Sequence, residues 1–154
     1  MSINIRPYQK VDYEQVKSIL EQRGLYEPRR DTFQELERKV DRDSKSVIVA
    51  EIQEKVVGVV YALKDGAIIT HLAVDPTYKN KGIGTLLMQA AERELSEKGI
   101  LEASIMVTEG LVPFHESQGY LQQPSKYVWM TKRLKHQRWI CPWLNFSSEP
   151  QKDL

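Results

Sequence analysis

The sequence Val74-Asp75-Pro76-Thr77-Tyr78-Lys79-Asn80-Lys81-Gly82-Ile83-Gly84-Thr85-Leu86-Leu87 decides how this chain folds. It overlaps the end of a strand-like run at 67–74. After it, apolar residues recur at helical spacing until Gly99 ends the pattern. The stretch is therefore expected to join a strand to a long helix through a short basic loop.

The start of this helix favours an anion-binding turn. The first N–H groups of a helix have no carbonyl partners and lie at the positive end of the helix dipole. Gly82 and Gly84 have no Cβ, so an anion can approach their backbone closely. Lys79 and Lys81 add positive charge. An ordinary turn with two glycines is the alternative, because the loop lacks the ending of a Walker motif and the third glycine of a dinucleotide motif.

The order of these parts resembles the GNAT (GCN5-related) N-acetyltransferases. Their cofactor motif, Arg/Gln-x-x-Gly-x-Gly/Ala after a strand, corresponds here to Lys79-Asn80-Lys81-Gly82-Ile83-Gly84, and Lys79 departs from the usual Arg or Gln. The resemblance covers residues 3–133 and is nearest to small stand-alone bacterial members. It implies that acetyl-CoA is the co-substrate and that main-chain amides hold its pyrophosphate. The residues expected to do so are Lys79, Asn80, Lys81, Gly82, Ile83, Gly84 and Thr85.

The resemblance also implies an α/β fold, the GNAT fold, with a mixed central sheet and the element order βααβββαβαββ. In this fold two parallel central strands splay apart and admit the pantetheine arm; here they correspond to 67–74 and 101–107. Asp12 and Gln15 are expected to form a capping box at the first helix. Periodicity predicts further strands at 3–8, 46–52, 56–63, 120–123 and 127–134, and helices that begin near 12, 31, 83 and 111.

Length and charge restrict the partners. The 154 residues, 41% of them hydrophobic, fit one folded domain. The resemblance implies an acetyltransferase domain at 1–134, and 135–154 is an aromatic C-terminal extension beyond the last strand expected of the family. A formal charge of +1 argues against a nucleic-acid partner. Without a signal peptide or a run of about 18 apolar residues, no membrane partner and a cytoplasmic location are expected. The single cysteine, Cys141, favours neither a disulfide nor a metal cluster, so no metal is expected.

The extension contains Trp139 and Trp143, which a disordered tail would lack. Packing over its own domain is the first interpretation. A homodimer contact and a cover for the substrate site are the alternatives.

Acetyl transfer from a thioester to an amine needs a base for the amine proton, a donor for the carbonyl oxygen and a proton for the leaving thiolate. By the resemblance, strand amides at Leu72, Ala73 and Val74 bind the thioester and pantetheine. The family's second motif has a tyrosine near the cofactor sulfur, and here His115 occupies that place. Histidine can donate a proton to a thiolate. Alternatively, His115 only lines the pocket.

No residue matches a family base. The places where some members have a glutamate hold Ile68 and Ala103 here. His71 is the candidate, because alternation points it away from Leu72 and Val74. A water chain to bulk solvent is the alternative.

Together these features predict an N-acetyltransferase that moves an acetyl group from acetyl-CoA directly to a primary amine of a small molecule or a peptide or protein. The loop at 24–31, which shapes the acceptor site in the family, carries mixed charge and does not specify the acceptor. A non-catalytic acyl-CoA-binding regulatory module is the alternative function, suggested by His115 in the place of tyrosine.

Overall fold

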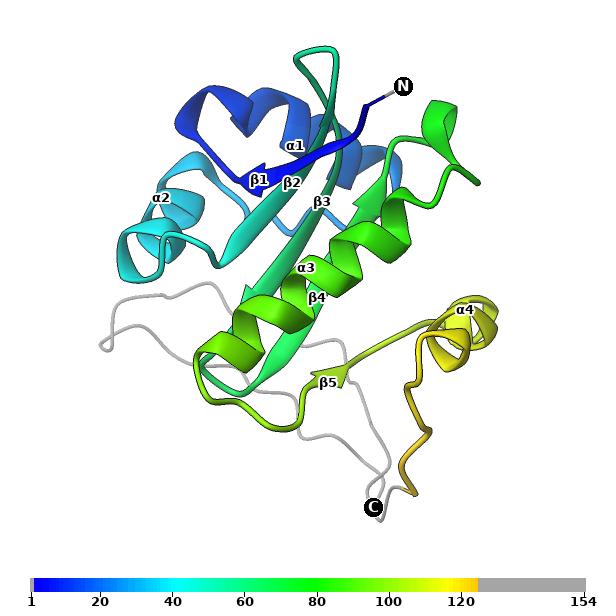
Figure 1. The fold of residues 1–154 in the computed structure, drawn as a ribbon. Coiled ribbons are helices and arrows are strands. Elements are labelled where there is room, and N and C mark those ends of the chain that lie inside the picture. The colour runs from blue at the N-terminus through cyan, green and yellow to red at the C-terminus, as the bar shows by residue number, and fades with distance from the viewer. Residues whose placement is uncertain (1, 125–154) are drawn as a thin grey trace, which may run out of the picture. The chain divides into compact units, whose positions relative to one another are not determined.

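The computed structural model describes residues 2–124 and shows a five-stranded mixed sheet in the order β1-β2-β3-β4-β5 (Figure 1). Strands β1 to β4 pair in antiparallel fashion, whereas β4 and β5 are parallel. The strands are β1 (Asn4–Pro7), β2 (Val47–Ile52), β3 (Lys55–Leu63), β4 (Ile68–Val74) and β5 (Ser104–Ile105). The α-helices are α1 (Tyr13–Gln22), α2 (Phe33–Arg42), α3 (Ile83–Glu97) and α4 (Val112–Ser117). All of these elements belong to a structural unit that ends at Tyr120.

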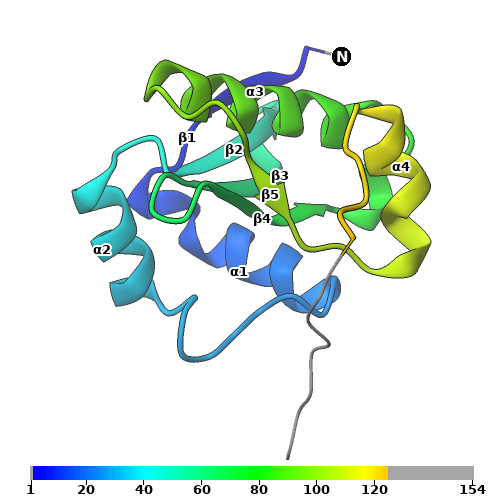
Figure 2. The ribbon, with the colours of Figure 1, turned by 90° about the horizontal axis from the view of Figure 1, so that it is seen from below.

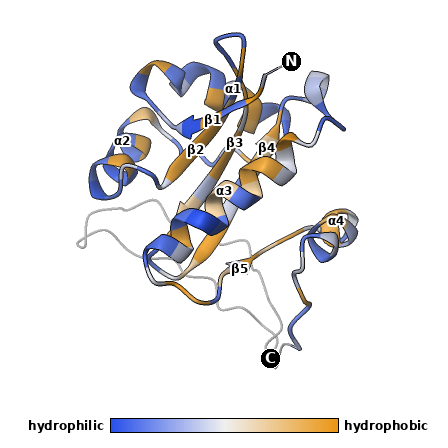
Figure 3. Ribbon diagram, viewed as in Figure 1, coloured by the Kyte–Doolittle hydropathy of each residue, from blue (hydrophilic) through white to orange (hydrophobic). Residues whose placement is uncertain are grey.

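Both faces of the sheet are covered. Helix α3 packs on one face, and α1 and α2 pack on the other (Figure 2). Along β3, Val60 and Ala62 join the apolar cluster beneath α3, while Val59 and Tyr61 join the cluster beneath α1 and α2. Since its residues are buried on both faces, β3 is a continuous hydrophobic run rather than an alternating one (Figure 3).

Helix α3 approaches the sheet closely where β3 carries Gly58. A Cβ at this position would lie 2.9 Å from Leu87 Cδ1 and 3.2 Å from the carbonyl oxygen of Ala73. Glycine therefore allows α3 to lie directly over β3 and β4, which fixes where the helix begins relative to the end of β4.

The structure confirms the predicted order of elements from β1 to α4, including the parallel pairing of β4 and β5. The strand predicted at 101–107 is wrong in extent, since only Ser104–Ile105 is a strand. The strand predicted at 120–123 is wrong, because 120–124 form neither helix nor strand and pair with no described strand. The strand predicted at 127–134 and the extension at 135–154 lie outside the described residues.

The predicted capping box at α1 is also wrong. Asp12 does not cap α1 with its side chain; its carboxylate accepts the N–H of Gln9 and pairs with Arg6 at 2.8 Å. Gln15 instead accepts the N–H of Val56 on β3. Asp12 therefore connects β1 to the start of α1, a role that the local pattern does not reveal. Within residues 2–124, no helix has the length and apolar character needed to span a membrane.

Candidate active site

The central opening of the sheet lies between β4 and β5. These strands pair only at Ile68 with Ser104 and at Ile69 with Ile105. Beyond this point β5 leaves the sheet and leads toward α4 (Figure 1). From residue 70 onward, β4 thus has no described strand on that edge.

Backbone donors of β4 face this opening. The N–H of Asp75 donates to Val57 on β3 at 2.8 Å. Because backbone groups alternate between the two edges of a strand, the N–H groups of Val74 and Leu72 face the opposite, open edge. The carbonyl of Val74 accepts a hydrogen bond from the Arg23 side chain at 2.9 Å, so Arg23 links the end of α1 to this edge.

The first turn of α3 lies just beyond the end of β4. The chain passes through a 3₁₀ turn at Pro76–Tyr78 and enters the helix through Gly82, whose φ is +76°. The N–H of Leu86 makes the first bond of the helix, to the carbonyl of Gly82 at 3.1 Å. No described carbonyl accepts the amides at 81–85. The turn therefore presents free donors at the positive end of a helix, as an anion site requires.

Both glycines of this turn leave room near the backbone. A Cβ at Gly82 would meet no atom within 4 Å. A Cβ at Gly84 would lie 3.5 Å from the ring of Phe114, which places α4 beside the start of α3. Lys79 and Lys81 are exposed. The cofactor residues expected from the sequence are thus close together: those on β4 and those in the turn border the same end of the sheet.

His71 lies at a bulge in β4. Across from it, β3 advances from Val59 to Tyr61 while β4 advances from Ala73 to Thr70, so β4 holds one extra residue. His71 has a φ of +54°, in the left-handed region that non-glycine residues rarely adopt. Its ring stacks on Tyr61 with centroids 4.3 Å apart, while Leu72 packs beneath α3. The predicted opposite orientation of His71 and Leu72 is therefore confirmed.

Asp31 lies behind His71. Its Oδ2 atom is 3.2 Å from Nε2 of His71 and accepts the N–H of Glu27 at 2.8 Å. Its Oδ1 atom accepts the Tyr61 hydroxyl at 3.1 Å. The residue is 1% exposed, whereas the His71 side chain is 15% exposed. Burial acts to raise the pKa of Asp31, but the hydrogen bonds from His71, Glu27 and Tyr61 hold it below its ordinary value.

His115 has different surroundings. It is 5% exposed on α4, and its ring packs edge-on against Phe114 and Tyr120. Its Nδ1 atom is buried and has no partner among the described residues. Burial lowers the pKa of His115, so the imidazole is neutral at pH 7. The Tyr120 hydroxyl donates to Glu92 on α3, which fixes the wall behind His115.

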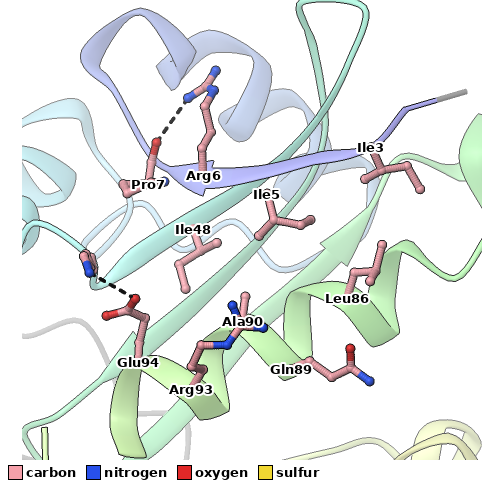
Figure 4. A pocket seen from close by; sticks show the side chains of 11 residues that line it. Ile3, Ile5, Arg6, Pro7, Ile48, Leu86, Gln89, Ala90, Arg93 and Glu94 are labelled. Carbon is pink, nitrogen blue, oxygen red and sulfur yellow. Dashed lines mark hydrogen bonds and ion pairs between the residues drawn. The ribbon is translucent and has the colours of Figure 1, made fainter. Parts of the chain in front are cut away.

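A pocket of about 350 Å³ lies elsewhere, between β1 and α3 (Figure 4). Strand β1 is at the opposite edge of the sheet from β5, so this pocket is separate from the central opening. Of the charged groups that line it, Arg6 forms an ion pair with Asp12, and Lys45 forms one with Glu94 at 3.5 Å. Within residues 2–124, no group of three or more His, Cys, Asp or Glu side chains could hold a metal ion.

The comparisons with known proteins agree with this geometry. The sequence model of a family described as "Acetyltransferase (GNAT) domain" matches residues 11–130. The chain belongs to the GNAT acetyltransferase family. A relative from Yersinia pestis, named as an acetyltransferase, is 30% identical over 137 residues, which cover 86% of this chain and 96% of the relative. An acetyltransferase of Sodalis glossinidius is 29% identical over the same shares of both chains.

Solved structures show the same GNAT fold. Ard1 from Thermoplasma volcanium has a TM-score of 0.69 and 23% identity, with 80% of this chain and 86% of that chain covered. The PaiA N-acetyltransferase of Thermoplasma acidophilum, solved with coenzyme A, has a TM-score of 0.62 and 21% identity, with 77% and 87% covered. The predicted family, the α/β fold class and the acetyltransferase activity are therefore confirmed. The roles of individual site residues stay predictions.

The sequence did not reveal the contribution of Asp31 and Tyr61. Asp31 precedes α2 and has the residue type of a helix cap, but Thr32 is the cap and accepts the N–H of Glu35 at 3.3 Å. The sequence did show that Asp31 is not needed as a cap where Thr32 caps the helix, and this could have pointed to another role for Asp31.

Proposed function

We propose that this enzyme transfers an acetyl group from acetyl-CoA directly to a primary amine of a small molecule or of a peptide or protein. The observation that carries the proposal is the opening between β4 and β5, which exposes strand amides and ends at the unpaired amides of α3. One structural relative with the same fold was solved in complex with coenzyme A, which supports this use of the opening.

In this proposal the cofactor lies along the open edge of β4. The amides from Lys79 to Thr85 hold the pyrophosphate, because they open a helix and are flanked by glycines. Leu72 and Val74 offer N–H groups to the pantetheine amides and to the thioester oxygen. Ala73 directs its own backbone groups toward Val59 on β3, so it spaces the two donors and lines the site. A dependence on acetyl-CoA, an intracellular metabolite, supports a cytoplasmic location.

The reaction then needs one attack and two proton movements. A neutral primary amine attacks the thioester carbon, a C–N bond forms, and the oxygen gains negative charge that strand amides stabilise. His71 accepts one proton from the amine nitrogen. The C–S bond breaks with its electron pair on sulfur, His115 donates a hydrogen bond to the thiolate, and the thiolate takes its proton from solvent. His115 acts as a neutral N–H donor, because burial lowers its pKa.

The experiment substitutes the second glycine of the turn. Gly84→Glu places a carboxylate where the diphosphate would bind, and we expect acetyl-CoA affinity to fall at least about 100-fold, which corresponds to about 2.7 kcal/mol. A Cβ at Gly84 meets Phe114 at an ordinary contact distance, so the fold should persist. Calorimetric titration with acetyl-CoA measures the affinity.

Gln89→Glu is the matched control, because it adds the same charge to an exposed position further along α3. We expect this variant to bind acetyl-CoA as the wild type does. Equal affinities for the wild type and Gly84→Glu would overturn the assignment of the turn. Release of the CoA thiol on a panel of primary amines then identifies the acceptor.

A further inference from the structure

The contact between Asp31 and His71 joins two parts of the chain that the reaction must bring together. Asp31 closes the loop at 24–31: its carboxylate accepts the N–H of Glu27, and its carbonyl accepts the Tyr13 hydroxyl at 3.1 Å. His71 lies on β4, the strand whose open edge receives the cofactor in the proposed function. One hydrogen bond at 3.2 Å thus connects the loop at 24–31, which shapes the acceptor site in the family, to β4.

The backbone at His71 is held in an unusual conformation for this contact. A φ of +54° in the middle of a strand carries an energetic cost for a residue with a Cβ. The side chain lies on the α1 and α2 face, where Tyr61 stacks on one side of the ring. Such a cost persists only where surrounding contacts fix the residue, and strained residues cluster at functional sites.

The partners of the two ring nitrogens determine which of them carries the proton. An ionised aspartate only accepts hydrogen bonds, so Nε2 of His71 must carry a hydrogen to donate to Asp31. In the neutral ring, Nδ1 is then the basic atom. The Thr70 hydroxyl lies 3.2 Å from Nδ1 and can donate to it, as a substrate N–H would. The ring is thus oriented with its basic atom directed away from the buried carboxylate.

We propose that Asp31 is a positioning residue for acetyl transfer: it fixes His71 with Nε2 protonated and Nδ1 unprotonated, so that Nδ1 can accept the proton of the acceptor amine in place of the Thr70 hydrogen bond. This inference rests on His71 being the base in the proposed function. As the C–N bond forms and the C–S bond breaks, the amine proton moves to Nδ1. The resulting imidazolium is stabilised by the Asp31 charge and later returns its proton to solvent.

The groups around this pair are compatible with that role. Tyr61 on β3 donates to Asp31, and burial raises its pKa, so it stays protonated. On α2, the Lys39 ammonium lies 5.8 Å from the centre of the Tyr61 ring, and Asp31 acts on it electrostatically. On α1, Tyr13 contacts the Asp31 carbonyl rather than its carboxylate. Lys39 is therefore the cation that faces the cluster from α2, and its effect on His71 opposes that of Asp31.

The first test is nuclear magnetic resonance of the ¹⁵N-labelled full chain, which contains three histidines. His71→Asn identifies the His71 signals by their loss. At pH 8 the wild-type ring should show a protonated Nε2 and an unprotonated Nδ1. In Asp31→Asn the preference for a protonated Nε2 should weaken, because a neutral amide accepts a hydrogen bond less strongly than a carboxylate. Asp43→Asn, which neutralises a partly buried aspartate that pairs with Lys98, should leave the His71 signals unchanged.

A protonated Nδ1 in the wild type would overturn the inference, and so would the same balance of the two ring tautomers in the wild type and Asp31→Asn. If Asp31→Asn does not fold, the wild-type tautomer still decides. These measurements need no acceptor, so they stand apart from the proposed reaction.

The second test is kinetic and uses an amine from the panel that the wild type acetylates. In Asp31→Asn, kcat should fall about 10- to 100-fold, while acetyl-CoA affinity is retained. If His71→Asn keeps the wild-type kcat, the base of the proposed function is wrong. If His71→Asn loses turnover but Asp31→Asn keeps the wild-type kcat, this inference alone is wrong.

Discussion

Two histidines of this enzyme, one partly and one fully buried, have opposite surroundings. His71 has a hydrogen-bond partner for each ring nitrogen, one of them an aspartate with a lowered pKa. His115 lies among aromatic rings, and its Nδ1 has no partner within residues 2–124. An anion stabilises the protonated form of the first ring, whereas burial favours the neutral form of the second. The difference suggests how the two share the chemistry, with His71 accepting a proton and His115 donating a hydrogen bond.

The largest expected effect comes from removing the base. Asn tolerates the left-handed backbone better than most residues, so His71→Asn removes the imidazole without adding strain at φ +54°. We expect kcat to fall by about 10²- to 10⁴-fold, the usual contribution of a positioned base. Acetyl-CoA affinity should be unchanged, because the proposed cofactor contacts are backbone amides and Asn can keep the same backbone conformation. A kcat within threefold of the wild type would favour a water chain as the proton acceptor.

A smaller effect is expected at the second histidine. His115→Phe keeps a ring of similar size but removes the N–H, and kcat should fall about 10-fold, because neutral donors contribute less than a positioned base. His115→Tyr restores a hydroxyl, whose pKa near 10 makes it a better acid than a neutral imidazole, so kcat should equal or exceed that of the wild type. Steady-state kinetics with acetyl-CoA saturating measures both.

The pH profiles of these variants decide between the alternatives for His115. Because burial lowers its pKa, all three proteins should share one rising profile between pH 7 and 9. A bell-shaped profile of kcat against pH in the wild type that is lost in His115→Phe would instead show that the charged imidazolium is the acid. Equal kcat in all three proteins would leave His115 as a residue that only lines the pocket.

The turn at 79–85 and the place of His115 were easier to predict from the sequence than the surroundings of His71. The turn at 79–85 was predictable because its glycines, lysines and helix start are contiguous, and His115 because it replaces a motif residue. The Asp31–His71–Tyr61 cluster was not, because its members are 30 and 40 positions apart and meet only after α2 packs on the sheet. The bulge at His71 depends on how β4 pairs with β3. The alternation of residues along β4 alone cannot reveal that pairing. The true extent of β5 likewise depends on its pairing, not on its residues.

Stability should change in opposite directions at the two histidines. His71→Asn deprives buried Asp31 of a donor, and we expect the free energy of unfolding to fall by about 1–2 kcal/mol. His115→Phe replaces a buried nitrogen that has no described partner with carbon, and we expect a rise of up to about 1 kcal/mol. Urea unfolding at pH 7.5 measures both values. A destabilised His115→Phe would indicate that His115 has a partner beyond residue 124.

The smallest expected effect is on how the free energy of unfolding depends on pH, through His115 and through Asp31. His115 has a pKa below 6.5 in the folded protein, so the unfolded chain binds more protons as pH falls below 6.5, and stability falls with it. Asp31 has a pKa below its ordinary 3.8, so its contribution is present above that pH and is lost below it. From pH 7 to 5, the wild type should therefore lose stability relative to His115→Phe. Relative to Asp31→Asn, the wild type should keep its higher free energy of unfolding until about pH 4.

Other carboxylates with lowered pKa, such as Asp43 and Asp75, titrate in the same acid range, so only these differences between proteins are informative. Urea midpoints at pH 7, 5 and 3.5 give the differences, and parallel curves for the wild type and His115→Phe would show that His115 is solvated in the folded enzyme.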